Sequence, residues 1–405
     1  MSIVDKISSL EESRNIIRSK MIAAGQATSN DKLNILASNL VIGGGGLDDS
    51  YGVTFADPDG VERSHIGIGW IITNKEFNSP VIIGDNVTNC TYMFFGCSNF
   101  NRPVTIGNNV TDCISMFQSC SKFNQPLTIP NNVISCANMF YSCSNFNQPV
   151  TIPNNVTNCN NMLYYCSNFN QPVTIGNNVT DCTKMFYSCS NFNQPVTIGN
   201  NVTECINIFE GCSKFNQPIN IPNNVTNCVG VFQSCSNFNQ PINIPNNVTN
   251  CSYMFQSCTI FNQPVTIPNN VINCSYIFRS CLRFNQPINI PNNVTNCISM
   301  FQSCSNFNQP INIPNNVISC SYMFTSCNNF SENIKVYSTV INNVKNMLRG
   351  NNSLRKNIFF KSAVNSVFNK TDANSLVGAT VTWTAMDNGF YNAAWNIYCY
   401  YNLAV

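Results

Sequence analysis

Apolar and polar positions repeat with a period of 23 residues over residues 77–330. A fixed period of this size is the signature of a solenoid, in which each copy forms one coil and stacked coils bury a continuous core. The pattern therefore predicts a repeat solenoid with eight inward residues per coil. In one copy these apolar positions are Val110, Cys113, Met116, Phe117, Cys120, Phe123, Leu127 and Ile129.

Short stretches of each copy carry local signals. Val-Thr-Ile or Ile-Asn-Ile alternates as a β-strand does, and it predicts an outward rank of Thr and Asn from Thr105 to Asn312. Met-Phe-x-x-Cys has the spacing of a short helical turn. Pro130 or its equivalent Gly107 predicts a turn, and the recurring Asn-Gln-Pro predicts ladders of Asn and Gln side chains from coil to coil.

The sequences on either side of the repeats differ from them, so the chain is divided into four segments. Residues 1–46 predict N-terminal helices and a Gly linker that form an attachment segment, and residues 47–76 predict a β cap with a degenerate first coil. Residues 77–335 are the solenoid. Residues 336–405 predict a degenerate repeat, in which Gly350 takes the second cysteine position, and a C-terminal β-hairpin. The hairpin either caps the last coil or joins copies of the chain into a homo-oligomer.

Twenty-two of the 23 cysteines lie in two columns that coincide with apolar columns. Free cysteine behaves as a small buried hydrophobe, so we expect a ladder of thiols inside the core. Disulfides between neighbouring coils are the alternative, because strands 4.7–4.9 Å apart allow the Cα separations that a bridge needs. The Cys-x6-Cys spacing does not match zinc sites, and we expect no metal and no cofactor.

Charge and composition exclude several classes of function. Charged residues make up 9 % of the chain and the net charge is +2, so neither nucleic acid nor an anionic membrane is an expected partner. No apolar run is long enough to span a membrane, and no export signal is visible. The single histidine, His65, has no patterned partner, and the repeat carboxylates are few and scattered, so we expect no enzymatic activity.

Invariant and variable columns separate packing from candidate binding residues. The residue two before the second cysteine varies, and Tyr141, Tyr164, Tyr187 and Arg279 lie in this stripe. A run of tyrosines suits contact with a protein or glycan, although drift on a solvent-exposed face explains the same variation. Trp395, Tyr398 and Tyr400 of the hairpin are further candidates for receptor contact. The residues assigned to the structural core are Cys113, Phe117, Cys120, Phe123, Cys136, Phe140, Cys143 and Phe146.

The repeat resembles the BspA-type leucine-rich repeat, whose unit also has 23 residues. The family's Phe-x-x-Cys matches Phe117–Cys120, and its Leu-x-x-Ile-x-Ile matches Phe123, Leu127 and Ile129 with one extra residue. The motif Met-Phe-x-x-Cys…Phe-Asn-Gln-Pro is similar to variant repeats found in surface proteins of low-GC bacteria and in phage-encoded proteins. The resemblance implies a right-handed coil with a short parallel strand and a helical turn per repeat, in proteins that bind surfaces or partners.

These observations lead to a functional hypothesis of a non-enzymatic interaction protein. Because no export signal is visible and free thiols suit cytosolic assembly, we expect a phage virion component: a fibre, decoration or receptor-binding protein assembled in the host cytoplasm. Its N-terminal helices would bind other virion proteins, and its solenoid a host cell-surface protein or glycan. The alternative is a cell-surface adhesin of the BspA-like repeat family.

Overall fold

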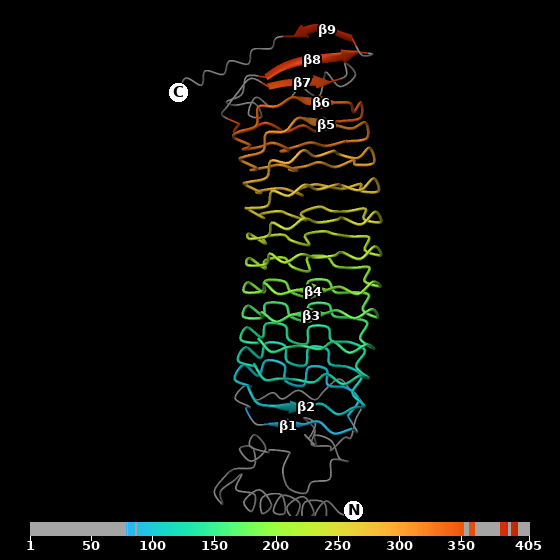
Figure 1. The fold of residues 1–405 in the computed structure, drawn as a ribbon, viewed down its shortest axis with the longest axis vertical. Coiled ribbons are helices and arrows are strands. Elements are labelled where there is room, and N and C mark those ends of the chain that lie inside the picture. Colours follow the sequence, from blue (N-terminus) through green and yellow to red (C-terminus); the bar gives the residue numbers. More distant parts are fainter. Residues whose placement is uncertain are drawn as a thin grey trace, which may run out of the picture. The chain divides into compact units, whose positions relative to one another are not determined.

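The computed structural model describes residues 78, 80–85, 87–351, 356–360, 381–387 and 390–395. The chain divides into two compact units, Met1–Asn155 and Val156–Val405. Within each unit, successive 23-residue repeats form coils that stack one on the next, which confirms a repeat solenoid (Figure 1). The N-terminal helices expected in residues 1–46 and the β cap expected in residues 47–76 lie outside the described residues.

Short parallel strands occupy the same place in some of the coils. In the first unit β1 (Val81–Ile82) pairs with β2 (Val104–Thr105). In the second unit β3 (Val173–Thr174) pairs with β4 (Val196–Thr197), and β5 (Ile311–Ile313) pairs with β6 (Ile334–Val336).

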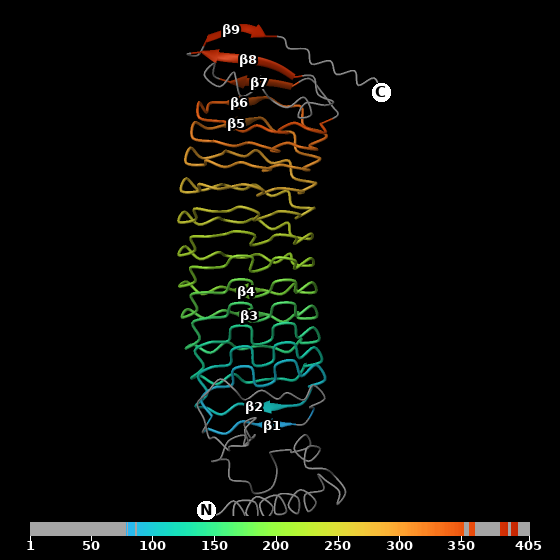
Figure 2. The same ribbon diagram turned by 180° about the vertical axis from the view of Figure 1, so that it is seen from behind.

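The last strands of the second unit extend this sheet in the order β5-β6-β7-β8-β9 (Figure 2). Strands β7 (Lys356–Phe360) and β8 (Val381–Asp387) continue the parallel pairing, and β9 (Phe390–Trp395) runs antiparallel to β8. Strands β8 and β9 form a hairpin within residues 336–405, where the sequence predicted a C-terminal hairpin. Its role as a cap or as a contact between copies stays a prediction.

One strand per coil was expected, and this is wrong because of the corner residue that follows the strand. The pairs β1–β2, β3–β4 and β5–β6 form where the second coil carries Gly107, Gly199 or Tyr337 at the corner. Gly84 and Gly176 stand at the corner of the first coil in two of these pairs, and the remaining coils between residues 87 and 336 carry proline there. A Cβ on Gly107 would lie 2.6 Å from the carbonyl oxygen of Gly84, so glycine permits a closer approach. The Tyr337 N–H donates to the Ile313 oxygen at 2.9 Å, a bond that proline cannot make.

The Met-Phe-x-x-Cys stretch was expected to be a helical turn, and the structure contradicts this. It forms successive β-turns, in which the N–H groups of Met116 and Cys120 donate to the oxygens three residues earlier. Ser115 and Ser119 have positive φ angles of 53° and 66°, and the same two positions are positive in the other described coils. An α-helix requires negative φ at every residue, so it cannot form here.

The turns leave alternate N–H groups free to bond the next coil. Those of Ser115, Phe117 and Ser119 donate to the carbonyl oxygens of Ala137, Met139 and Tyr141 at 2.9, 2.9 and 2.7 Å. A helix would have kept these donors within one coil. We call the surface of the residues between the two cysteine columns the turn face. Within each unit this face carries backbone hydrogen bonds between successive coils, whereas the strand face pairs only some of them.

Stacked phenylalanine rings fill the core of each unit. Phe232 and Phe238 of one coil have ring centroids 4.1 Å apart, and Phe238 stacks on Phe261 of the next coil at 6.0 Å. Leu163 replaces the ring in one coil and is also fully buried. Leu127, expected to point inward, is only partly buried. The eight residues assigned to the core from the sequence have no exposed surface.

The 22 described cysteines are buried free thiols, so the structure contains the thiol ladder rather than disulfides between coils. In the second column nine sulfurs bond a backbone oxygen of the preceding coil. For example, the Cys258 thiol donates to the Phe232 carbonyl oxygen at 3.0 Å. In the first column, the sulfurs of Cys274 and Cys297 are 3.9 Å apart.

Asn and Gln side chains form the expected ladders. The Asn239 Oδ1 accepts hydrogen bonds from the Asn262 backbone N–H at 2.9 Å and from Gln263 Nε2 at 3.4 Å. A second ladder joins Asn270 Nδ2 to the Asn246 carbonyl oxygen at 2.8 Å. The outward Thr and Asn rank is exposed along the strand face, as the alternation predicted.

In the degenerate copy near residue 350, the position equivalent to the second cysteine lies one residue later than the sequence predicted. Gly350 does not take the cysteine position; it has a φ of 71° and occupies the second positive-φ position. Asn351 takes the cysteine position and is fully buried. Its Nδ2 donates to the Phe324 carbonyl oxygen at 2.8 Å, which replaces the thiol hydrogen bond of the other coils. The extra residue in this copy comes from the corner around Ser338, which the 23-residue count missed.

Candidate functional site

The turn face of the second unit gathers aromatic and charged side chains in three consecutive coils. Tyr164 and Tyr187 occupy the variable stripe one coil apart, and their rings stack at 4.4 Å with an interplanar angle of 7°. Tyr165, at a positive-φ position, meets both rings edge-on at 4.6 and 5.7 Å and remains 46 % exposed. With Lys184 and Glu210 these residues form what we call the tyrosine cluster.

Charges of both signs complete the cluster. The Lys184 Nζ lies 6.0 Å from the Tyr187 ring centroid, and the Tyr187 hydroxyl is hydrogen-bonded to the Glu210 carboxylate. Burial raises the pKa of Tyr187, and the negative charge of Glu210 raises it further. Burial also raises the pKa of Glu210, because it outweighs the hydrogen bond from Tyr187 and the charge of Lys184. The ionised Glu210 therefore lowers the stability of the folded state.

Replacing this carboxylate with an amide is expected to stabilise the protein at neutral pH. A raised folded-state pKa favours folding below the unfolded value of 4.5 and loses that contribution as pH rises through the folded pKa. Glu210→Gln keeps an acceptor for Tyr187 and removes the charge. Thermal unfolding should show a higher midpoint for the variant at pH 7 and near-equality at pH 4. A lower midpoint at pH 7 would show that the Lys184 attraction dominates instead.

A second aromatic pair lies further along the turn face of the same unit. Tyr253 and Tyr276 stack at 4.6 Å, and the Arg279 guanidinium lies 5.8 Å from the Tyr276 ring centroid. Burial raises the pKa of Tyr253, while the charge of Arg279 opposes this. Arg279, chosen from the sequence, thus belongs to a second group of stacked tyrosines.

The other sequence candidates are distributed differently. Tyr141 belongs to the first unit and is partly buried. Trp395 ends strand β9, and Tyr398 and Tyr400 lie outside the described residues. Sequence reasoning missed Tyr165, Lys184, Glu210 and the Tyr253–Tyr276 pair as parts of these clusters. The 23-residue spacing of Tyr253 and Tyr276 was a signal that could have found that pair.

The tyrosine cluster offers aromatic surface, hydrogen-bonding groups and two opposite charges, which suits contact rather than covalent chemistry. Across the part of the chain that the structure describes, no group of three His, Cys, Asp or Glu side chains could hold a metal ion. Within the same residues, no helix has the length and apolar character to cross a bilayer.

Two solved structures share a general likeness with this chain. One is a leucine-rich cell surface protein from Faecalibacterium prausnitzii A2-165, with 20 % identity, a TM-score of 0.45, and coverage of 72 % of this chain and 81 % of that one. The other is a leucine-rich repeat protein from Bacteroides ovatus ATCC 8483, with 16 % identity, a TM-score of 0.45, and coverage of 75 % and 91 %. Neither likeness is close enough to transfer a function.

No curated protein matches the chain. One family model matches it five times, over residues 73–175, 130–201, 176–267, 198–290 and 267–363. Together these matches span residues 73–363, well over half of the 405 residues. The chain therefore belongs to the family described as "Mycoplasma protein of unknown function, DUF285".

Proposed function

We propose that this chain is a non-enzymatic interaction protein that binds a protein partner through the tyrosine cluster. The observation that supports this is the contrast on the turn face. Most positions of these coils are buried packing residues or uncharged repeat residues, whereas Tyr165, Lys184 and Glu210 gather exposed aromatic surface and opposite charges on three consecutive coils. Exposed tyrosines on a rigid scaffold give contact area at a small cost in conformational entropy.

We propose further that the protein acts as a cell-surface adhesin. The similarity of its repeat to BspA-type repeats supports this placement. Nothing in the described residues favours the virion component that the sequence suggested, and neither the family model nor the two solved structures names one. The adhesin therefore takes its place as the proposed role.

The binding role is tested with residues that the repeat itself accepts. Tyr165→Ser and Tyr187→Gln introduce the side chains that Ser188 and Gln233 carry at the corresponding positions, so the turns should be preserved. The fluorescently labelled full-length chain is titrated onto intact candidate host cells. The double variant is expected to bind at least ~10-fold more weakly, about 1.4 kcal/mol.

The matched control is Tyr322→Ser, which removes a tyrosine from the turn face outside the cluster and should bind like the parent chain. Equal binding by the double variant and the parent would refute the role of the cluster. The proposed location on the cell surface is tested with an antibody against this protein, which is expected to label intact cells that produce it. Labelling only after the cells are opened would contradict the surface location.

A further inference from the structure

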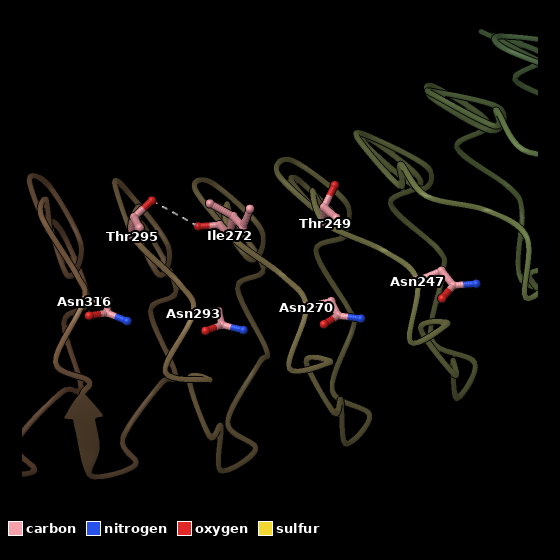
Figure 3. Close-up of a pocket in the computed structure, with 7 residues that line it drawn as sticks. All are labelled: Asn247, Thr249, Asn270, Ile272, Asn293, Thr295 and Asn316. Carbon is pink, nitrogen blue, oxygen red and sulfur yellow. Dashed lines mark hydrogen bonds between the residues drawn. The ribbon is translucent and has the colours of Figure 1, made fainter.

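A groove runs along the second unit, lined by residues that precede the first cysteine of each coil (Figure 3). It has a volume of 490 Å³ and extends over four coils. One side is a row of four asparagines, the second Asn of each Pro-Asn-Asn corner: Asn247, Asn270, Asn293 and Asn316. The other side is formed by Thr249, Ile272 and Thr295.

The asparagine row presents fixed hydrogen-bonding groups. Each Nδ2 donates one hydrogen to the backbone oxygen of the preceding coil, at 2.8 Å in Asn270 and Asn293 and 2.9 Å in Asn316. This bond holds the amide in one orientation, and Figure 3 shows the four amides aligned along the row. No described group is bonded to the Oδ1 atoms. Each amide therefore keeps an acceptor oxygen and a second N–H for a ligand.

The opposite wall adds acceptors and an apolar surface. The Thr249 and Thr295 hydroxyls donate to backbone oxygens of the preceding coil at 3.4 Å, which leaves the lone pairs of these hydroxyls available. Between them Ile272 is 50 % exposed. The groove thus pairs a row of donor–acceptor groups with a small apolar strip, an arrangement that matches the hydroxyls and the C–H faces of a sugar.

The absence of charge and the bonded backbone N–H groups of the groove disfavour two classes of ligand, anionic polymers and peptides that add as a β-strand. None of its lining residues is charged, so an anionic polymer gains nothing from it. A peptide that adds as a β-strand needs free backbone groups. Here the N–H groups of Thr249, Ile272 and Thr295 already bond the preceding coil. We propose that this groove binds a neutral, linear polysaccharide through its hydroxyl groups.

The length of the asparagine row sets the size of the ligand. Coils that stack like paired strands are about 4.8 Å apart, so four amides span roughly 14 Å. A disaccharide cannot contact the whole row, whereas an oligosaccharide of several units can. Affinity should therefore increase with chain length until the row is filled.

The experiment measures binding of cellohexaose and chitohexaose to the full-length chain by isothermal titration calorimetry, with cellobiose and chitobiose as short probes. A hexasaccharide is expected to bind at least tenfold more tightly than its disaccharide. Ile272→Glu places a hydrated charge on the apolar strip and should weaken hexasaccharide binding at least tenfold. Ile134→Glu is the matched control, because Ile134 occupies the same repeat position in the first unit with 49 % exposure.

Three outcomes would overturn the proposal: no binding of either hexasaccharide, equal binding by the parent and Ile272→Glu, or equal losses in Ile272→Glu and Ile134→Glu. Binding of an uncharged Asn- and Thr-rich peptide in place of the sugars would also overturn it. The proposal does not depend on the tyrosine cluster, so Tyr165→Ser with Tyr187→Gln should leave sugar binding unchanged.

Discussion

Replacing Phe232 with alanine is expected to lower the free energy of unfolding of the second unit by about 3–5 kcal/mol. The ring is fully buried and stacks on Phe238 at 4.1 Å. It also stacks on Phe209 and Phe255 of the two neighbouring coils at 5.9 and 5.8 Å. Alanine would leave a cavity between three coils. Because each coil contacts only its neighbours, distant coils cannot compensate for this loss.

Phe232→Leu is the matched control, because Leu163 already occupies the corresponding position of another coil. Leucine keeps most of the apolar volume and should cost less than about 1.5 kcal/mol. Urea unfolding followed by circular dichroism measures both variants. The alanine variant should also broaden or split the transition, since a weak coil uncouples the coils on its two sides. Equal losses in the two variants would show that the ring stack is not what stabilises the coil.

The packing of this protein could be predicted from the sequence because the period of 23 residues identifies the inward positions directly. Cys113, Phe117, Cys120 and Phe123 are fully buried, as their columns required. The Asn ladder followed from the same reasoning, since a polar residue that recurs at a coil corner meets its own copy in the next coil.

The local conformation could not be predicted, because two structures share the spacing of Met-Phe-x-x-Cys. A helical turn and a pair of β-turns both bring the Met, Phe and Cys side chains inward. Hydrogen bonds to the next coil favour the β-turns. Turns at Ser115 and Ser119 permit these bonds, whereas a helix does not. The number of strands was overestimated for a related reason: a proline at the corner fits within its own coil but removes the N–H that would bond the preceding coil.

The tyrosine cluster was predicted in part. Tyr164 and Tyr187 lie in one column, so their stacking follows from the period alone. Tyr165 lies in a different column, and only the positive φ of 57° at this residue turns its ring across the other two. Contacts between columns depend on the path of the chain around the coil, which a one-dimensional period does not contain.

None of the 22 thiols from Cys90 to Cys327 is expected to react with a water-soluble aromatic disulfide reagent while the protein is folded. Each of these side chains has no exposed surface. Burial also raises the pKa of Cys136 from 9.0 to about 12, so its reactive thiolate is about 1000-fold scarcer than at an ordinary thiol. The reagent can therefore reach these sulfurs only after the coils open.

The measurement uses Cys399→Ser, which removes the one cysteine outside the described residues. The folded variant should release almost no coloured thiol, and the denatured variant should release 22 equivalents. Fast labelling of the folded protein would contradict the buried ladder. A denatured, unreduced sample with fewer than 22 reactive thiols, and with a mass lower by the hydrogens lost in each bridge, would show that neighbouring coils are joined by disulfides instead. Since the Cys274 and Cys297 sulfurs lie 3.9 Å apart, that pair is the first place to look for such a bridge.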